Sequence, residues 1–295
     1  VDGTLVLVNS SVIDCNGNFD ATGGTVTFTG AGQLNISGSV TDLGTFTEST
    51  GKLVLDGSST QTIPDPETFY DLQINNNSNV SLAGAVNVNG TLTLGNGDLI
   101  TSGNDLIILN SMSAGSSSGH VVGTVKYSSS TTNSCIISIG DGSNLRPVIL
   151  KANAVTPTVY TVSYVTGIPS GATIDWVNYP SGVEISGSNA NYCNNSYYFD
   201  ISPSVVVSTD ITLDYGGLTP PGSGNGYLLH YNSSTNKWEE LSSSSTASTV
   251  TGTATSFSPF GQGSGGSALA IDLASFNGTC SNSEVELEFV VVSQT

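Results

Sequence analysis

Positively charged residues are nearly absent from this sequence, and charge of either sign is scarce. Lys and Arg number 5 against 23 Asp and Glu, which gives a formal net charge of −18 at pH 7, and charged residues make up only 9% of the 295. Nucleic-acid binding and attachment to anionic membranes both need clustered basic side chains, so this composition excludes both classes of partner. No run approaches the roughly 20 consecutive apolar residues of a membrane-spanning helix, so we expect no membrane insertion.

Good helix formers are also in short supply. Gly, Ser, Thr, Asn, Val and Ile dominate the sequence, and nearly all of them rank low in helix propensity. With so few charges, ion pairs between successive helical turns could not compensate. Hydrophobic residues at 37%, together with 35 glycines, match an ordinary globular protein and indicate a sizeable core rather than disorder. The composition therefore predicts an all-β fold.

The first 119 residues repeat a short pattern in which Gly precedes an alternating apolar run, as in residues 3–7, 24–28, 51–55 and 90–94. Strands of four or five residues between Gly, Asn, Ser and Asp turns fit a winding path, and the larger units recur at roughly 20 to 27 residues, a spacing typical of solenoids. We predict a short parallel β-solenoid of about five coils over residues 1–119. On the sequence alone, a β-sandwich of short antiparallel strands remains the alternative.

Beyond residue 119 the strands lengthen and aromatic residues concentrate, which predicts an antiparallel β-sandwich over residues 120–260. Strand alternation favours a core position for these aromatics over a role in stacking on sugars. The Gly- and Ser-rich stretch 261–267 is typical of a linker. Residues 268–295 predict a C-terminal β-hairpin that turns at Asn277 and Gly278, with a second strand that ends in an apolar run at 290–292.

Three groups of residues carry a resemblance. Residues 52–57 (KLVLDG), 61–64 (QTIP) and 69–76 (FYDLQINN) are similar to the β-helical repeats of secreted surface proteins of the Bacteroidetes, of the type IX secretion kind. Residues 140–148, 237–241 and 257–260 resemble the β-rich module that follows those repeats. Residues 271–278 with 285–287 resemble the start of their C-terminal immunoglobulin-like module, of which only the first hairpin is present here. The resemblance implies an extracellular or cell-surface location, and Val1 in place of Met fits a processed chain.

We find no constellation of residues that predicts catalysis, and we predict that the protein is not an enzyme. Residues 115–119 match the G-x-S-x-G pattern but lack the flanking strand and helix of a nucleophile elbow. Acidic residues are scattered singly at turns, whereas polysaccharide hydrolysis needs a carboxylate pair. His120 and His230 lack a second ligand at metal spacing. Asp98, Asp105 and Asp141 are candidates for calcium, but none lies in a calcium-loop motif, so the predicted cofactor is none.

The four cysteines include no C-x-x-C pair, which argues against metal binding and thioredoxin-like chemistry. In an extracellular protein they are disulfide candidates. Cys135 and Cys193 share the predicted sandwich and are the natural pair. Cys15 and Cys280 lie at opposite ends of the chain, so a bond between them would need a folded-back terminus or a neighbouring subunit. Four buried thiols remain the alternative.

The two ends of the chain support a hypothesis of assembly. The first residues enter a strand at once, which leaves unpaired backbone groups at a solenoid end, and a lone hairpin at the other end is marginally stable in water. Open edges of this kind favour head-to-tail assembly by strand addition. The residues predicted to dock are Leu269, Ile271, Leu273, Val285, Leu287, Phe289, Val290, Val291 and Val292.

The sequence thus predicts a non-enzymatic extracellular structural protein, a subunit of a bacterial cell-surface filament whose main partner is a second copy of the chain. Glycans remain open as a further partner. The alternatives are a monomeric secreted adhesin and a β-helix protein that binds or degrades polysaccharides. The hairpin could equally fold against its own sandwich, which would leave the protein monomeric.

Overall fold

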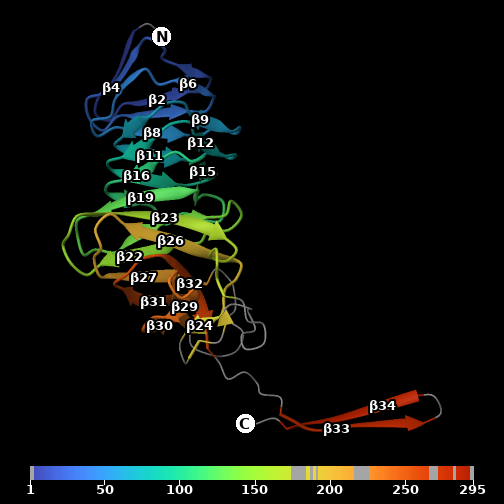
Figure 1. Ribbon diagram of the computed structural model, residues 1–295. Coiled ribbons are helices and arrows are strands. Elements are labelled where there is room, and N and C mark those ends of the chain that lie inside the picture. The colour runs from blue at the N-terminus through green and yellow to red at the C-terminus, as the bar shows by residue number, and fades with distance from the viewer. Residues whose placement is uncertain are drawn as a thin grey trace.

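The computed structural model describes residues 3–173, 184–186, 189–190, 192–215 and 226–265, together with the backbone of strands at 272–281 and 284–292. Every regular element in these ranges is a β-strand, so the all-β prediction is confirmed (Figure 1). Among the same residues, no helix is long and apolar enough to cross a membrane.

The first part of the chain is a parallel β-solenoid of about seven turns, each with three short strands. The first strands of the coils are β1 (Thr4–Leu7), β4 (Thr25–Phe28), β7 (Thr45–Thr47), β10 (Glu67–Phe69), β13 (Val86–Val88), β16 (Leu106–Ile108) and β19 (Thr124–Ser129). The second strands are β2 (Val12–Cys15), β5 (Gln33–Ile36), β8 (Lys52–Leu55), β11 (Asp71–Ile74), β14 (Thr91–Leu94), β17 (Ser111–Met112) and β20 (Cys135–Ile137). The third strands are β3 (Phe19–Asp20), β6 (Val40–Asp42), β9 (Gln61–Ile63), β12 (Val80–Leu82), β15 (Leu99–Ile100), β18 (Val121–Val122) and β21 (Ile139–Gly140).

The solenoid has more coils than the expected five, and it continues past residue 119. Each coil takes about 20 residues, as the pairing of Leu72 with Leu53 of the preceding coil and Leu92 of the following coil shows. Strands of only two residues, such as β15 and β17, give too little alternation to be recognised in the sequence. The seventh coil runs from β19 to β21, where Val121 pairs in parallel with Ile139.

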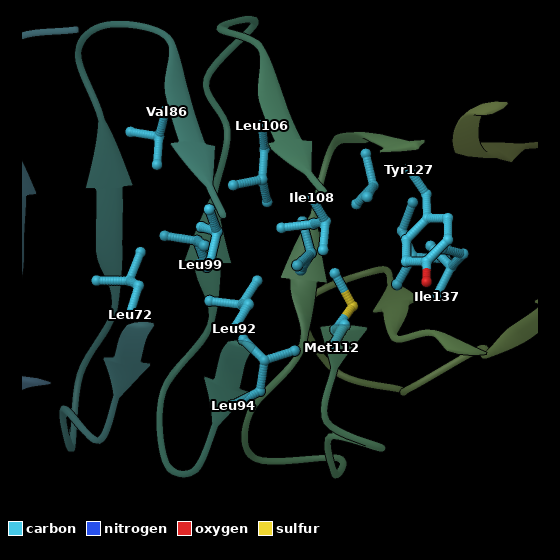
Figure 2. Close-up of a cluster of buried hydrophobic side chains, with 14 of the residues drawn as sticks. Leu72, Val86, Leu92, Leu94, Leu99, Leu106, Ile108, Met112, Tyr127 and Ile137 are labelled. Atoms are coloured by element: carbon cyan, nitrogen blue, oxygen red, sulfur yellow. The ribbon is translucent and has the colours of Figure 1, made fainter. Parts of the chain in front are cut away.

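Alternating side chains explain why these short strands stack. Along β5, β11 and β14 every second residue is buried, because successive side chains of a strand point to opposite faces. The inward residues are Leu, Val and Ile, and they form one hydrophobic cluster that continues into the following domain. Figure 2 shows such side chains meeting between neighbouring coils. Where β7 and β10 do not pair, the ring of Phe46 bridges them, 5.6 Å from Phe28 and 5.2 Å from Phe69 between centroids.

One sheet of the solenoid runs directly into the second domain. β19 pairs in parallel with β16 on one side and antiparallel with β23 on the other, in a sheet of order β10-β13-β16-β19-β23-β26-β32-β28-β29-β24. A five-stranded sheet of order β20-β22-β27-β31-β30 accompanies it. The strands are β22 (Val148–Ala152), β23 (Thr158–Thr166), β24 (Ile185–Ser186), β25 (Tyr192–Cys193), β26 (Tyr197–Pro203), β27 (Thr209–Asp214), β28 (Gly226–Asn232), β29 (Lys237–Glu240), β30 (Ser243–Ser245), β31 (Thr249–Ala254) and β32 (Pro259–Ser264).

Two local expectations need correction. Residues 261–264, expected in a linker, belong to β32, which lies between β26 and β28 in the sheet. The C-terminal hairpin is present as β33 (Asp272–Ser281) and β34 (Glu284–Val292), but Asn277 and Gly278 lie within β33 and pair with Glu288 and Leu287. The first strand is therefore longer than predicted and continues to Ser281.

Candidate functional site

The first coil has open backbone edges. Its strands β1, β2 and β3 each pair with one described strand only, namely β4, β5 and β6 of the second coil. Large apolar side chains are also exposed here: Val6 is 49% exposed, Val8 55% and Val12 59%. The repeat pattern of the sequence predicted these strands but not the exposure of their valines, because that depends on which coils stack beside them.

An apolar hollow opens at the same end of the solenoid. Its volume is about 170 Å³, and its apolar lining comes from Leu5, Phe19, Ala21 and Val26. In the coils below, the equivalent space is filled by the side chains of the adjoining coil, so that Leu34 and Leu53 are at most 1% exposed. The first coil therefore presents an unfilled core together with unpaired backbone groups.

The hairpin of β33 and β34 forms a two-stranded sheet of its own, hydrogen-bonded to no other strand that the structure describes. Figure 1 shows it apart from the sandwich, at the end of the molecule opposite the first coil. Of the predicted docking residues, Leu269 and Ile271 lie outside the described residues. The others occupy the two strands: Leu273 on β33, and Val285, Leu287, Phe289, Val290, Val291 and Val292 on β34.

A second feature lies at the corner between the second and third strands of the coils. Asp98 precedes β15 and His120 precedes β18, one coil further on. The Asp98 Oδ1 atom lies 3.1 Å from the backbone nitrogen of His120 and 3.1 Å from its Nδ1 atom. The imidazole is fully buried, and its Nε2 atom accepts a hydrogen bond of 3.1 Å from the backbone N–H of Gly142.

This arrangement fixes the protonation of His120. Because Nε2 accepts a hydrogen bond, the ring proton resides on Nδ1, where it faces Asp98 Oδ1 and the Ser116 carbonyl oxygen, 3.1 Å away. The ring is then neutral, and neither of its nitrogens is available to a metal ion. The sequence analysis considered Asp98 and His120 separately. Their contact arises because they are one coil length apart in the sequence.

A polar hollow of about 550 Å³ adjoins this pair. Only Asn, Ser, Gly and Asp98 line it, and they come from the same corner of successive coils: Asn77, Ser78, Asn79, Asn96, Gly97, Asp98, Ser117, Ser118 and Gly142. Ser117, the central residue of the G-x-S-x-G pattern, is exposed in the turn between β17 and β18. It therefore lines an open hollow rather than occupying a strand-to-helix elbow.

The predicted disulfide between Cys135 and Cys193 does not form in the structure. Neither they nor Cys15 take part in a disulfide bond, and Cys135 and Cys193 belong to separate hydrophobic clusters. Cys135 begins β20 at the end of the solenoid, whereas Cys193 lies on β25 against β32. Burial raises the pKa of Cys135 to about 12 and also raises that of Cys193, so both thiols stay protonated and unreactive at neutral pH. The side chain of Cys280 lies outside the described residues.

The three carboxylates considered for calcium are each engaged within the fold. Asp98 holds His120, and Asp105 accepts a hydrogen bond of 2.7 Å from Lys126 Nζ. Asp141 Oδ1 accepts hydrogen bonds from the backbone N–H groups of Ser143 and Asn144 at 2.8 and 2.7 Å. Within the described ranges, no group of three His, Cys, Asp or Glu residues is placed to hold a metal ion.

A Ser–His contact that the sequence did not reveal lies in the sandwich. Ser258 Oγ is 2.7 Å from His230 Nε2 and donates its proton to the Tyr231 carbonyl oxygen at 2.5 Å. His230 Nε2 must then donate to Ser258, so it cannot act as a base toward that hydroxyl. Burial lowers the pKa of His230, which keeps the ring neutral at neutral pH. The contact is structural, joining β28 to the chain just before β32.

Comparisons of this chain with protein-family models, curated proteins and solved structures found no match. The function must therefore be argued from two features of the fold: the open β edges at its ends and the polar corner around Asp98.

Proposed function

We propose that this chain is a non-enzymatic structural subunit of an extracellular, cell-surface filament. Copies join head to tail, and the C-terminal hairpin of one copy adds strands to the open first coil of the next. The observation that carries this proposal is the presence of unpaired β edges at both ends of the described fold, on β1, β2 and β3 and on the β33–β34 pair.

Unpaired backbone groups on both elements favour their association. An exposed edge strand presents N–H and C=O groups that can pair with another chain, and proteins commonly block such edges with Lys. Strands β1, β2 and β3 carry no Lys or Arg. A two-stranded hairpin is at best marginally stable alone in water. Pairing a strand of the hairpin with one strand of the first coil satisfies one open edge of each element.

The hollow in the first coil adds a place for apolar side chains. Its lining of Leu5, Phe19, Ala21 and Val26 resembles the interior of the lower coils, which accept Leu, Val or Ile from the coil above. β34 supplies alternating apolar residues in its sequence, Val285, Leu287 and Phe289 among them. Because donor and acceptor are different surfaces, the contact can repeat from copy to copy, and it builds an open filament when the rotation between copies does not close a ring.

The location and source rest on the residues that resemble secreted surface proteins of the Bacteroidetes. A chain with 9% charged residues and a Ser-, Thr- and Asn-rich surface also suits a fibre in which neighbours pair closely. We propose export to the cell surface on these grounds, and a second copy of the chain as the main partner.

Deleting residues 268–295 tests the proposal. The full chain is expected to form filaments in negative-stain images, and the truncated chain to remain monomeric by light scattering, with its circular dichroism otherwise unchanged. Filaments of the truncated chain would contradict donation by the hairpin. Isolated particles of the full chain at all concentrations would favour the monomeric adhesin or carbohydrate-binding alternative.

A pair of variants tests the receiving edge. Val6→Glu with Val12→Glu places negative charges on the outward face of the first coil at positions that are already half exposed, so folding is preserved. This double variant should assemble at least about tenfold more slowly. With Val285, Leu287 and Phe289 directed into the hollow, the alternate residues of β34 are glutamates, and like charges on adjacent strands are destabilising. The matched control is Val155→Glu with Val206→Glu, where valines are 74% and 64% exposed in sandwich loops. Equal slowing by both pairs would contradict the assignment of the receiving edge.

A further inference from the structure

The polar hollow beside Asp98 has the composition of a binding site that the assembly role does not use. It lies on the side of the solenoid, in the turns before β12, β15 and β18, rather than at either open end. Its volume of about 550 Å³ falls within the range of small-molecule sites. Such sites are usually lined by apolar side chains, whereas this one is polar throughout, which favours a ligand rich in hydroxyl groups.

Asp98 directs a hydrogen-bond acceptor into this hollow. Its side chain is 10% exposed, and Oδ1 is occupied by the two contacts with His120. Oδ2 has no hydrogen-bond partner among the described residues. It lies on the side of Gly142, where a Cβ atom would be 3.9 Å from it. A carboxylate oxygen that is largely shielded and unpaired binds a hydroxyl group more strongly than an exposed one does.

Side-chain amide groups that can donate hydrogen bonds lie close to Asp98 Oδ2. Asn79 Oδ1 accepts a hydrogen bond of 3.0 Å from the backbone N–H of Asp98, which fixes the amide and leaves its Nδ2 group without a partner in the described part of the chain. The amides of Asn77 and Asn96 also line the hollow and are exposed. Together these residues offer one strong acceptor flanked by amide donors.

The charge and the residue types of the lining indicate which class of ligand fits the hollow. Because His120 is neutral, the carboxylate of Asp98 gives the lining one negative charge, and no Lys or Arg lines the hollow to attract an anion. A calcium ion takes six to eight oxygen ligands, commonly from several carboxylates, and only one carboxylate is present. No aromatic ring is present to hold a flat apolar molecule. We propose that the hollow binds a neutral saccharide, with Asp98 Oδ2 accepting from a sugar hydroxyl and Asn79 Nδ2 donating to one.

Titration calorimetry on the full chain tests this site. The probes are soluble hexasaccharides of glucose, mannose, xylose and galactose, with calcium chloride and a galacturonate oligomer as the competing classes. At least one neutral hexasaccharide should bind the unaltered chain, and neither the calcium salt nor the acidic oligomer should. Failure of all the neutral probes, or binding of calcium instead, would overturn the proposal.

Two variants locate the binding. Asp98→Asn keeps an Oδ1 acceptor for His120 but replaces the free Oδ2 by an amide group, so affinity should fall at least about tenfold while the fold persists. Ser117→Trp fills the hollow from an exposed position and should abolish binding. The control is Ser234→Trp, at an exposed serine in the turn between β28 and β29, which should bind as the unaltered chain does. Unchanged affinity in Ser117→Trp would place the sugar elsewhere.

Discussion

Gln61 and Glu67 show how differently two polar side chains are accommodated in neighbouring coils. Gln61 is 2% exposed, and its Nε2 donates to the carbonyl oxygens of Ile36 and Gly38 at 2.8 and 2.7 Å. Its Oε1 accepts from Asn76 Nδ2 at 2.7 Å, so the amides join successive coils at one corner. Fully satisfied buried networks of this kind fix the stacking register. Among the described residues, Glu67 has no comparable set of donors, and its carboxyl group interacts with the backbone N–H of Thr68.

Glu67 should make the stability of the solenoid depend on pH. Burial, followed by the charges of Asp65, Asp42 and Glu48, raises the pKa of its carboxyl from 4.5 to about 7. Between these values the folded chain retains a proton that the unfolded chain has lost, so stability falls as the pH rises through this window. Glu67→Gln removes the effect. The variant should be more stable than the unaltered chain at about pH 8.5 and equal to it at about pH 4.

The measurement is the urea midpoint of both chains at the two pH values. The side chain is only half-buried, and screening by solvent reduces the gain at high pH to about 1 kcal/mol. Asp200→Asn is the matched control, since it also removes one negative charge but from an exposed position on β26. An equal gain in this control would assign the effect to net charge rather than to Glu67.

At the scale of elements, β32 shows what glycine does inside a sheet. Gly261 pairs with Leu229 of β28, and a Cβ atom there would lie 3.0 Å from the Trp238 ring, which is fully buried. Gly261 is therefore required by the indole ring, and Gly263 by the side chain of Leu229 at 2.8 Å, rather than by a linker. Composition alone cannot separate the two cases, since both need residues without side chains.

Gly261→Ala should destabilise the sandwich by about 1–3 kcal/mol, the usual cost of an added carbon in a packed core. Unfolding followed by near-UV circular dichroism and urea midpoints would measure this loss. Adding Trp238→Phe should recover part of it, because the smaller ring leaves room for the methyl group. Gly17→Ala is the control: a Cβ atom there would have no neighbouring atom within 4 Å, so stability should stay the same or rise slightly.

Other elements differ in how well the sequence predicted them. The run at 90–94 alternates over four residues and the run at 51–55 is mostly apolar, and they are strands β14 and β8. The contact between Asp98 and His120 could have been predicted by assuming one coil between them. The contact between Ser258 and His230 could not, because it joins strands that are neighbours only through the antiparallel sheet. Neither the cysteine count nor its spacing showed that Cys135 and Cys193 lie in separate clusters.

At the scale of the whole molecule, the boundary between solenoid and sandwich is a shared strand. β19 completes the solenoid face through β16 and begins the antiparallel sheet through β23. The hydrophobic cluster also crosses this boundary without interruption, from Leu7 to Phe260. The sequence predicted a boundary at residue 119, because the strands lengthen and aromatic residues become frequent beyond it. A change of strand direction, however, does not require a break in the sheet.

Because the solenoid and the sandwich share β19, a destabilising substitution in this strand should affect both of them. Val125 is fully buried on β19, opposite Val162 of β23, and Val125→Ala should cost about 2 kcal/mol. Because β19 belongs to both parts, amide exchange should accelerate in β13 and β16 and in β23 and β26 together.

The control is Leu34→Ala, in the second coil, which removes an equally buried side chain far from the junction. Stacked coils contact mainly their neighbours, so this variant should loosen the first coils and leave the sandwich protected. Hydrogen exchange followed by mass spectrometry distinguishes the two patterns, and acceleration confined to one side of β19 in Val125→Ala would show that the two parts unfold independently.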